Sequence, residues 1–395
     1  MSISSRVQQN LAQGGWIKKM FDEGIILKQQ YGDENVFDFT LGNPVMEPPD
    51  EFHRELRKLA ENPRPGMHRY MQIPGYAETR EAVAEQLSLD TGIAFTQDDI
   101  IMTCGTAGAA NVVLKTILNP GDEVIIFAPY FPEYLFYIDN YDGVAKISPT
   151  DEQFIPELDV LEAAIGAKTK ALIVNSPNNP SGVVYSEGLL QQLGQLLQKK
   201  ETQYGTQIIL ISDEVYRKII YDGLKYPSPL LHHRQSVMIT SHSKDLALPG
   251  ERIGYIAVHP DCSLRQEIIN GLIYCNRTLG YVSAPALMQR IVTRLQAVTV
   301  PVARYQQQRD FLYRNLSEMG YAMMKPQGAF YLFPETPIAD DVAFTGELLQ
   351  WNVITVPGVD FGVPGHIRLS YCVDDRTLEG SLAGFRRAAR KFSGG

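Results

Sequence analysis

One lysine in this chain lies in a setting that favours covalent chemistry over surface solvation. Lys244 closes the run SHSK directly after the apolar segment SVMIT, and Gly250, Arg252 and Gly254 follow it closely. Lysine is rarely buried without cause, and a desolvated lysine becomes an amine nucleophile. An isolated lysine would simply be a solvated surface residue. The hypothesis of a reactive amine therefore depends on which other groups reach the same place.

Two further motifs after apolar runs have both a chemical and an ordinary structural interpretation. Gly105-Thr106-Ala107 opens a helix-like segment, and the free N–H groups of a helix start can bind an anion. Small residues at such a turn also serve plain strand–helix packing. Phe131, in the motif YFPEY, follows EVIIFAP and could stack on a planar ring or simply fill the core. Neither motif is decisive alone.

Two polar motifs follow the next apolar runs. Asn179 lies in NSPNNPSG, where the prolines impose a turn that could aim one amide side chain or could be only a turn. Asp213 ends the run QIILIS and begins DEVY. A carboxylate at the end of a buried strand needs a partner, such as a protonated heterocyclic nitrogen, unless it only caps a helix. Taken together, the motifs make coincidence a poor explanation.

The segments that must position these residues are predicted to form an α/β sheet. Runs rich in Ile and Val without polar alternation suit strands buried on both faces of a mainly parallel sheet. The predicted strands end near Cys104, Pro129, Pro177, Asp213 and Ser243, and GYIAVHP closes the series. Ligands bind at the carboxyl ends of the strands in such a sheet, which is where the motifs fall.

The pattern changes in the C-terminal third of the chain. One long helical stretch is predicted from about Pro285 to Met319, followed by the strand-like pieces GAFYLFP, NVITVPG and HIRLSYC. The sequence therefore predicts two domains, a large one over 46–284 and a smaller α+β one formed by 1–45 and 285–395.

Composition excludes several classes of function. The 395 residues include 36 basic and 45 acidic ones, a net charge of −9 with no basic run, which argues against nucleic acid and anionic membranes as partners. The four cysteines have no metal-type spacing, so no metal site is expected. The N-terminus has no signal-peptide pattern and no segment is suited to crossing a bilayer. A cytoplasmic location is predicted.

The motifs SHSKDLALPGERIGY, NSPNNPSG, SDEVY and HIRLSY occur in an order that resembles the fold-type-I, class I/II aminotransferases, in particular the aspartate-aminotransferase-like group. The resemblance covers essentially the whole chain. It implies an α/β fold with a mainly parallel seven-stranded sheet in the large domain and a smaller α+β domain. It also implies pyridoxal 5′-phosphate (PLP) as the cofactor and an L-amino acid and a 2-oxo acid as substrates.

The resemblance implies a role for each matching residue. Lys244 would form the internal aldimine and move the proton between the substrate α-carbon and the cofactor on the way to pyridoxamine phosphate. Asp213 would pair with the pyridine nitrogen, while Tyr216 and Asn179 would hydrogen-bond the ring oxygen. Arg368 would bind the substrate α-carboxylate, beside Asn179 and Gly42. The ring and phosphate would be held by Gly105, Thr106, Ala107, Phe131, Ser241, Arg252 and Tyr70.

Tyr70 would reach the phosphate from the neighbouring subunit, so a homodimer with shared active sites is predicted. The sequence departs from the family pattern at two positions. Cys104 stands where relatives often have Gly or Ser, and Phe131 replaces the Trp or Tyr common at the stacking position. Neither departure removes a group that the chemistry requires.

The substrate side chain and the exact reaction stay open at this stage. Aspartate or another dicarboxylic amino acid is favoured over alanine or an aromatic amino acid, and Arg277, His68 and Arg69 are candidate partners for a distal carboxylate, or merely surface charges. A β-lyase or an enzyme resembling aminocyclopropane-carboxylate synthase is the alternative reaction. A non-catalytic PLP-binding regulator is a further alternative, although it would carry a DNA-binding domain ahead of this fold.

Overall fold

The computed structural model describes residues 3–13 and 15–392. The helices are α1 (Ser5–Gln13), α2 (Trp16–Tyr31), α3 (Asp50–Glu61), α4 (Ala77–Thr91), α5 (Gly105–Ile117), α6 (Glu133–Asp139), α7 (Leu158–Ala164), α8 (Glu187–Tyr204), α9 (His242–Asp245), α10 (Arg265–Thr278), α11 (Ala286–Val292), α12 (Val302–Glu318), α13 (Asp341–Leu349) and α14 (Asp375–Phe392). The strands are β1 (Phe37–Asp38), β2 (Ile100–Thr103), β3 (Glu123–Phe127), β4 (Val144–Ser148), β5 (Thr169–Asn175), β6 (Ile209–Asp213), β7 (Ser236–Ser241), β8 (Gly254–Val258), β9 (Tyr331–Leu332), β10 (Val353–Ile354), β11 (Val356–Pro357) and β12 (Ile367–Ser370).

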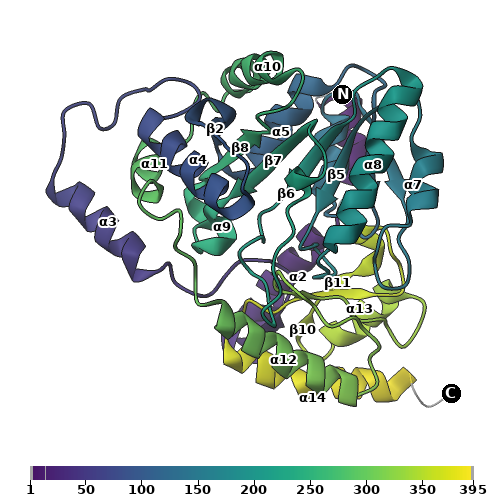
Figure 1. Ribbon diagram of the computed structural model, residues 1–395. Coiled ribbons are helices and arrows are strands. Elements are labelled where there is room, and N and C mark those ends of the chain that lie inside the picture. The colour runs from purple at the N-terminus through teal and green to yellow at the C-terminus, as the bar shows by residue number, and fades with distance from the viewer. Residues whose placement is uncertain (1–2, 14, 393–395) are drawn as a thin grey trace.

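A seven-stranded sheet forms the centre of the larger part of the chain (Figure 1). Its strand order is β2-β8-β7-β6-β5-β3-β4, and β8 runs antiparallel to both of its neighbours while the other pairs are parallel. The predicted mainly parallel sheet is therefore confirmed. Its parallel strands end at one edge, which brings the segments after β5, β6 and β7 together.

Both faces of this sheet are covered by helices, which explains why its strands lack polar alternation. Successive residues of β3 point to different cores: Val124 and Ile126 pack with α5, α6 and α10, whereas Ile125 and Phe127 pack with α7 and α8. On β2, Ile101 joins the first core, while its neighbours pack with α3, α4 and α11. Since both faces are apolar, β6, β7 and β8 are buried at every position.

The edge strand β4 was absent from the predicted strands. Its residues Val144–Ser148 pair in parallel with β3, but only Ser148 is fully buried. An edge strand packs against one neighbour and keeps much of its surface in solvent, so it does not need the continuous apolar run that marked the central strands.

The predicted single helix from about Pro285 to Met319 is wrong in one respect, because the structure forms α11 and α12 with a break between them. Pro301 precedes α12 and cannot donate a backbone hydrogen bond. Backbone groups in the break bind the sheet-bearing part instead: Val298 O accepts from Lys218 Nζ at 3.3 Å, and Val300 N donates to Asp245 O at 2.7 Å.

The C-terminal part packs α12, α13 and α14 around two small sheets, β1–β10 and β11–β12–β9. Figure 1 shows α12 and α14 side by side beyond one end of the large sheet, with α2 between the two parts. The parallel pairing of β1 with β10 joins residues 37–38 to residues 353–354. The domain boundaries at 45/46 and 284/285 stay a prediction.

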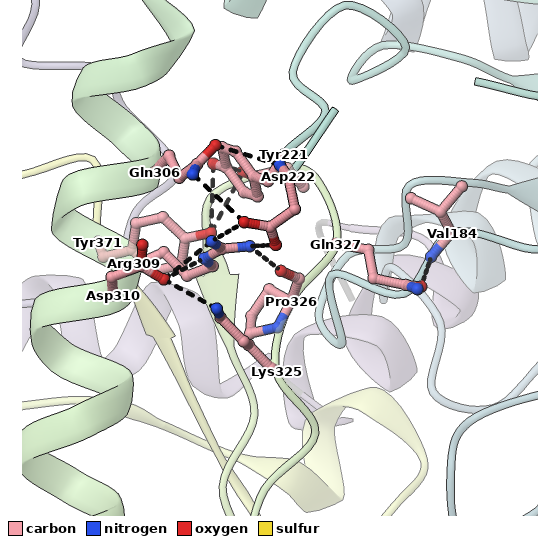
Figure 2. Close-up of polar contacts among 11 residues, drawn as sticks. Val184, Tyr221, Asp222, Gln306, Arg309, Asp310, Lys325, Pro326, Gln327 and Tyr371 are labelled. Carbon is pink, nitrogen blue, oxygen red and sulfur yellow. Dashed lines mark hydrogen bonds and ion pairs between the residues drawn. The ribbon is translucent and has the colours of Figure 1, made fainter. Parts of the chain in front are cut away.

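A buried arginine anchors the C-terminal part to the chain after β6 (Figure 2). Arg309 on α12 makes paired hydrogen bonds of 2.7 and 2.9 Å to the two carboxylate oxygens of Asp222, and a third of 2.8 Å to Pro326 O. The next residue, Gln327, accepts a hydrogen bond from Val184 N at 3.1 Å. Residues 326–327, which lead into β9, are therefore hydrogen-bonded both to α12 and to the segment between β5 and α8.

None of the helices described is long and apolar enough to cross a membrane.

Candidate active site

A cavity of about 270 Å³ lies at the carboxyl ends of β5, β6 and β7. Its walls carry all of the predicted site residues except Gly105 and Tyr70, namely Gly42, Thr106, Ala107, Phe131, Asn179, Asp213, Tyr216, Ser241, Lys244, Arg252 and Arg368. A larger hollow of about 980 Å³ lies before the start of β7, and none of the predicted residues lines it. The smaller cavity is therefore the candidate active site.

One end of the cavity is built to hold an anion. Helix α5 starts at Gly105, whose φ of +72° favours glycine, and a Cβ there would lie 3.0 Å from Arg252 Nη2. Thr106 Oγ1 donates to Ser241 Oγ at 2.9 Å, and Ser241 Oγ donates to Ser243 Oγ at 3.0 Å. Helix N–H groups, hydroxyls and a guanidinium meet here, as a phosphate requires. Ser243 had not been predicted as a site residue.

Asp213 ends β6 and is only 5% exposed. Burial raises the pKa of its carboxyl to about 6, although a hydrogen bond from Tyr134 opposes the shift. Tyr134 Oη donates to Asp213 Oδ2 at 2.5 Å. The sequence interpretation missed Tyr134 as a site residue, although it lies three residues after Phe131 in the same motif. A buried carboxyl with a raised pKa is suited to a cationic partner.

Lys244 lies in the one-turn helix α9, which directly follows β7. Its Nζ donates to Gly42 O at 2.5 Å. Burial lowers the pKa of the Lys244 amine to about 8, and the positive charges of Arg368 and Arg252 act in the same direction. A larger fraction of the amine is therefore neutral near pH 7 than for an exposed lysine, as nucleophilic or base catalysis requires.

Arg368 on β12 reaches the cavity from the C-terminal part and is 2% exposed. Its Nη1 donates to Asn179 Oδ1 at 3.1 Å, and its Nη2 donates to Thr40 O. Its Nε is buried without a hydrogen-bond partner. Since guanidinium N–H groups bind carboxylates in pairs, Arg368 retains donors for an anionic ligand.

Tyr216 and Tyr331 meet beside Arg368. Their hydroxyls are 2.7 Å apart, and burial together with Tyr331 holds the pKa of Tyr216 well above its ordinary value. A Cβ on Gly42 would clash with the Tyr331 hydroxyl, so glycine is required there by this side chain. The sequence analysis had placed Gly42 beside the substrate α-carboxylate, without a role for Tyr331. Tyr331 was not predicted as a site residue.

The structure of one chain does not bring Tyr70 or the three cationic candidates for a distal carboxylate to the cavity. Tyr70 is 89% exposed, and Arg277, His68 and Arg69 are also exposed and do not line the cavity walls. Among the described residues, the only Lys or Arg side chains on those walls are Lys244, Arg252 and Arg368.

The residues present fit PLP. Gly105 has no Cβ and so leaves room for a phosphate beside Arg252 and the Thr106 and Ser241 hydroxyls. The buried Asp213 carboxyl suits a protonated ring nitrogen, and the amine of Lys244 lies in the same cavity. Phe131 also lines the cavity, and its ring is of a type that can stack on a planar cofactor. Within the described residues, no cluster of His, Cys, Asp and Glu is arranged to hold a metal ion.

Sequence comparison identifies the family. A family model described as aminotransferase class I and II matches residues 34–384. A probable aspartate/prephenate aminotransferase of Thermus aquaticus is 32% identical over 356 residues, covering 88% of this chain and 90% of the relative. The aspartate/prephenate aminotransferase of Thermus thermophilus is also 32% identical and covers 88% of this chain and 89% of its own.

Solved structures agree with the sequence relatives. An amino transferase from Eubacterium rectale superposes with a TM-score of 0.95 at 36% identity, covering 99% of each chain. Aspartate aminotransferase from Thermus thermophilus with maleate gives a TM-score of 0.86 at 29% identity, covering 98% of this chain and 100% of the other. The predicted fold type and cofactor are confirmed, and the elimination and regulator alternatives are not favoured. The chain belongs to the class I and II aminotransferases and is an amino-acid transaminase that uses PLP.

Proposed function

We propose that this transaminase takes a dicarboxylic L-amino acid, aspartate or glutamate, as its donor and holds the α-carboxylate with Arg368. The observation that carries the α-carboxylate part of the proposal is the buried Arg368 guanidinium, whose Nε has no hydrogen-bond partner, beside Asn179 and in the same cavity as Lys244. The names of the Thermus relatives and the maleate in one of the similar structures support a dicarboxylic substrate.

The roles of the other residues follow from their chemistry. When bound, PLP supplies an electron-withdrawing ring that stabilises negative charge on the substrate α-carbon. Asp213 keeps the ring nitrogen protonated, Tyr216 donates a hydrogen bond to the ring oxygen, and Arg252 holds the phosphate. Lys244 Nζ, whose pKa burial lowers to about 8, would bind the cofactor covalently at rest and would remove the α-proton of the substrate during turnover.

The donor preference and the role of Arg368 are tested together. Single amino acids are added to the purified enzyme without any 2-oxo acid, and the cofactor's visible absorbance is followed. Aspartate or glutamate should change the spectrum rapidly, and oxaloacetate or 2-oxoglutarate should restore it. In Arg368→Ala the concentration needed for half-maximal change should rise roughly 100-fold, because a charge-assisted pair is lost.

The matched control for that experiment is Arg234→Ala, an arginine with a 77% exposed side chain that lies outside the cavity. It should behave as wild type. If only other amino acids change the spectrum, the donor assignment is wrong while the reaction class stands. An unaltered half-maximal concentration in Arg368→Ala would disprove the role of that arginine.

We also propose that the enzyme is a cytoplasmic homodimer in which Tyr70 completes the phosphate site of the second subunit. Tyr70 is 89% exposed and does not line the cavity of its own chain. Large apolar side chains of α2 and the following segment are also exposed, including Phe21, Ile25, Ile26 and Val45, as a subunit interface would explain. All four cysteines are free, which fits a reducing compartment.

Mixed dimers test the shared site. Tyr70→Ala and Lys244→Ala should each be strongly impaired alone. After the two variants are unfolded and refolded together, about half of the dimers are mixed, and one of their two sites carries both Lys244 and Tyr70, so about a quarter of all sites should be active. The measurement is the specific activity of the mixture, with the oligomeric state checked by sedimentation. A mixture no more active than the average of its two components would show that Tyr70 does not act across subunits.

A further inference from the structure

Tyr331 begins β9 and is only 2% exposed, yet it contacts both functional halves of the cavity. Its hydroxyl lies 2.7 Å from the Tyr216 hydroxyl, and the Arg368 guanidinium carbon lies 5.0 Å from the centre of its ring. None of the roles assigned above uses this side chain. It touches one group assigned to the cofactor and one assigned to the substrate.

The hydroxyl contact has a preferred direction under the proposed function. A phenol has one proton to donate, and Tyr216 gives its proton to the cofactor's ring oxygen in the role assigned above. Tyr331 must then donate to the Tyr216 oxygen. A hydrogen bond received by a hydroxyl strengthens the one that the hydroxyl donates, because the bonds in a chain polarise one another.

The ring contact concerns the orientation of Arg368. The Arg368 guanidinium carbon lies 5.0 Å from the centre of the Tyr331 ring and 4.8 Å from that of Phe361. Such contacts stabilise a cation and leave the in-plane N–H groups free. Two of these groups already bind Asn179 and Thr40, so the plane of the guanidinium is fixed before substrate arrives.

We propose that Tyr331 is a positioning residue that connects the two halves of the site: its hydroxyl orients and polarises Tyr216 toward the cofactor, and its ring holds Arg368 in place for the substrate carboxylate. This inference rests on the proposed roles of Tyr216 and Arg368. Tyr331 is not a catalytic residue in this scheme, because it acts only through those two side chains.

The chain that leads into Tyr331 is rigidly held, as the proposal requires. Arg309 binds Pro326 O at 2.8 Å, and Gln327 accepts from Val184 N at 3.1 Å (Figure 2). The backbone N–H of Ala329 donates to Ile219 O at 3.0 Å. The backbone at Gly42 packs against the Tyr331 hydroxyl, because a Cβ at this position would clash with it.

Three variants separate the two contacts. The first readout is the pH midpoint of the resting holoenzyme's visible absorbance, which needs no substrate, and the second is the KM for the amino donor.

Tyr331→Phe keeps the ring and removes the hydroxyl. Its absorbance midpoint should rise by roughly 0.3–0.6 pH unit, because a weakened Tyr216 bond leaves more negative charge on the ring oxygen to hold the titrating proton. Its KM should stay within about twofold.

Tyr331→Leu should show the same rise in midpoint and, in addition, a KM raised roughly three- to tenfold. Phe361→Leu is the matched control: it loses a ring beside Arg368 but no hydroxyl, so its KM should rise while its midpoint stays at the wild-type value. Cofactor content and thermal unfolding of each holoenzyme establish that the variants are folded and loaded.

Combining Tyr331→Phe with Tyr216→Phe tests whether the shift of the absorbance midpoint passes through the Tyr216 hydroxyl. In the Tyr216→Phe background, Tyr331→Phe should no longer move the midpoint, and a persisting shift would overturn the proposal. A wild-type midpoint in Tyr331→Phe, or a wild-type KM in Tyr331→Leu, would overturn it too. Failure of the donor assignment is distinguishable, because it appears as a wild-type enzyme that ignores aspartate and glutamate while the substrate-free midpoints still respond to Tyr331.

Discussion

Replacing Lys244 with alanine is expected to lower the transamination rate roughly 10³–10⁴-fold, because the only amine on the cavity walls of the described chain is lost. Cofactor binding should persist, since Arg252, Asp213 and the start of α5 remain. After borohydride reduction, mass spectrometry should find the cofactor's mass on the peptide that contains residue 244 in the wild type and on no peptide in the variant. Activity and cofactor content are measured on the same preparations.

The control for this variant is Lys199→Ala, whose side chain is 63% exposed on α8 and paired with Glu162. It should keep wild-type activity and wild-type labelling at Lys244. Wild-type turnover in Lys244→Ala would disprove the assigned mechanism. Loss of both activity and cofactor would instead show that the covalent bond, and not the phosphate cradle, provides most of the binding energy.

The variant Asp213→Asn is expected to change the loaded enzyme and the apoprotein in opposite directions. In the loaded enzyme, the buried pair with the ring nitrogen is lost, so removal of the substrate α-proton should slow roughly 10²–10³-fold and cofactor affinity should fall. Isotope exchange of the α-proton and the Kd for cofactor measure these effects. The amide oxygen introduced by the substitution can still accept the hydrogen bond from Tyr134, so packing is preserved.

The apoprotein effect follows from the pKa of Asp213, which burial raises from 3.8 to about 6. The folded chain binds this proton more tightly than the unfolded chain, so stability falls as pH rises between about 4 and 6. Above pH 6 the buried charge costs about 3 kcal/mol, and the Asp213→Asn variant avoids that cost. At pH 8 the free energy of unfolding of apo Asp213→Asn should therefore exceed that of the wild type, and below about pH 4 the two should agree.

Urea unfolding of both apoproteins at pH 4 and pH 8 measures this difference. Asp261→Asn is the control, because its side chain is 65% exposed and lies outside the cavity. It should leave the stability at both values unchanged. If the Asp213→Asn apoprotein is less stable than the wild type at pH 8, the Asp213 carboxylate is not destabilised by burial. The assigned pairing with the cofactor's ring nitrogen would then lose its basis.

The fold could be predicted wherever the sequence carried a one-dimensional signal. Central strands such as β3 and β6 carry runs of apolar residues because helices cover both faces of the sheet, so these strands could be recognised in the sequence. The edge strand β4 carries no such run and was missed. The break between α11 and α12 was also missed, because the backbone there bonds to Lys218 and Asp245, residues far away in the sequence.

The sequence by itself determined the family and the cofactor through its motifs, and it named most of the predicted residues that line the cavity. It could do so because several of these motifs directly follow strands, and parallel strands end at one edge of the sheet. Only the tertiary structure revealed that Tyr134 holds Asp213 and that Tyr331 contacts both Tyr216 and Arg368. The Tyr134–Asp213 and Tyr216–Tyr331 pairs join residues separated by 79 and 115 positions, and no local pattern encodes the distance between them. Burial likewise arises only when the chain is packed, so the lowered pKa of Lys244 and the raised pKa of Asp213 are properties of the fold and not of the motifs.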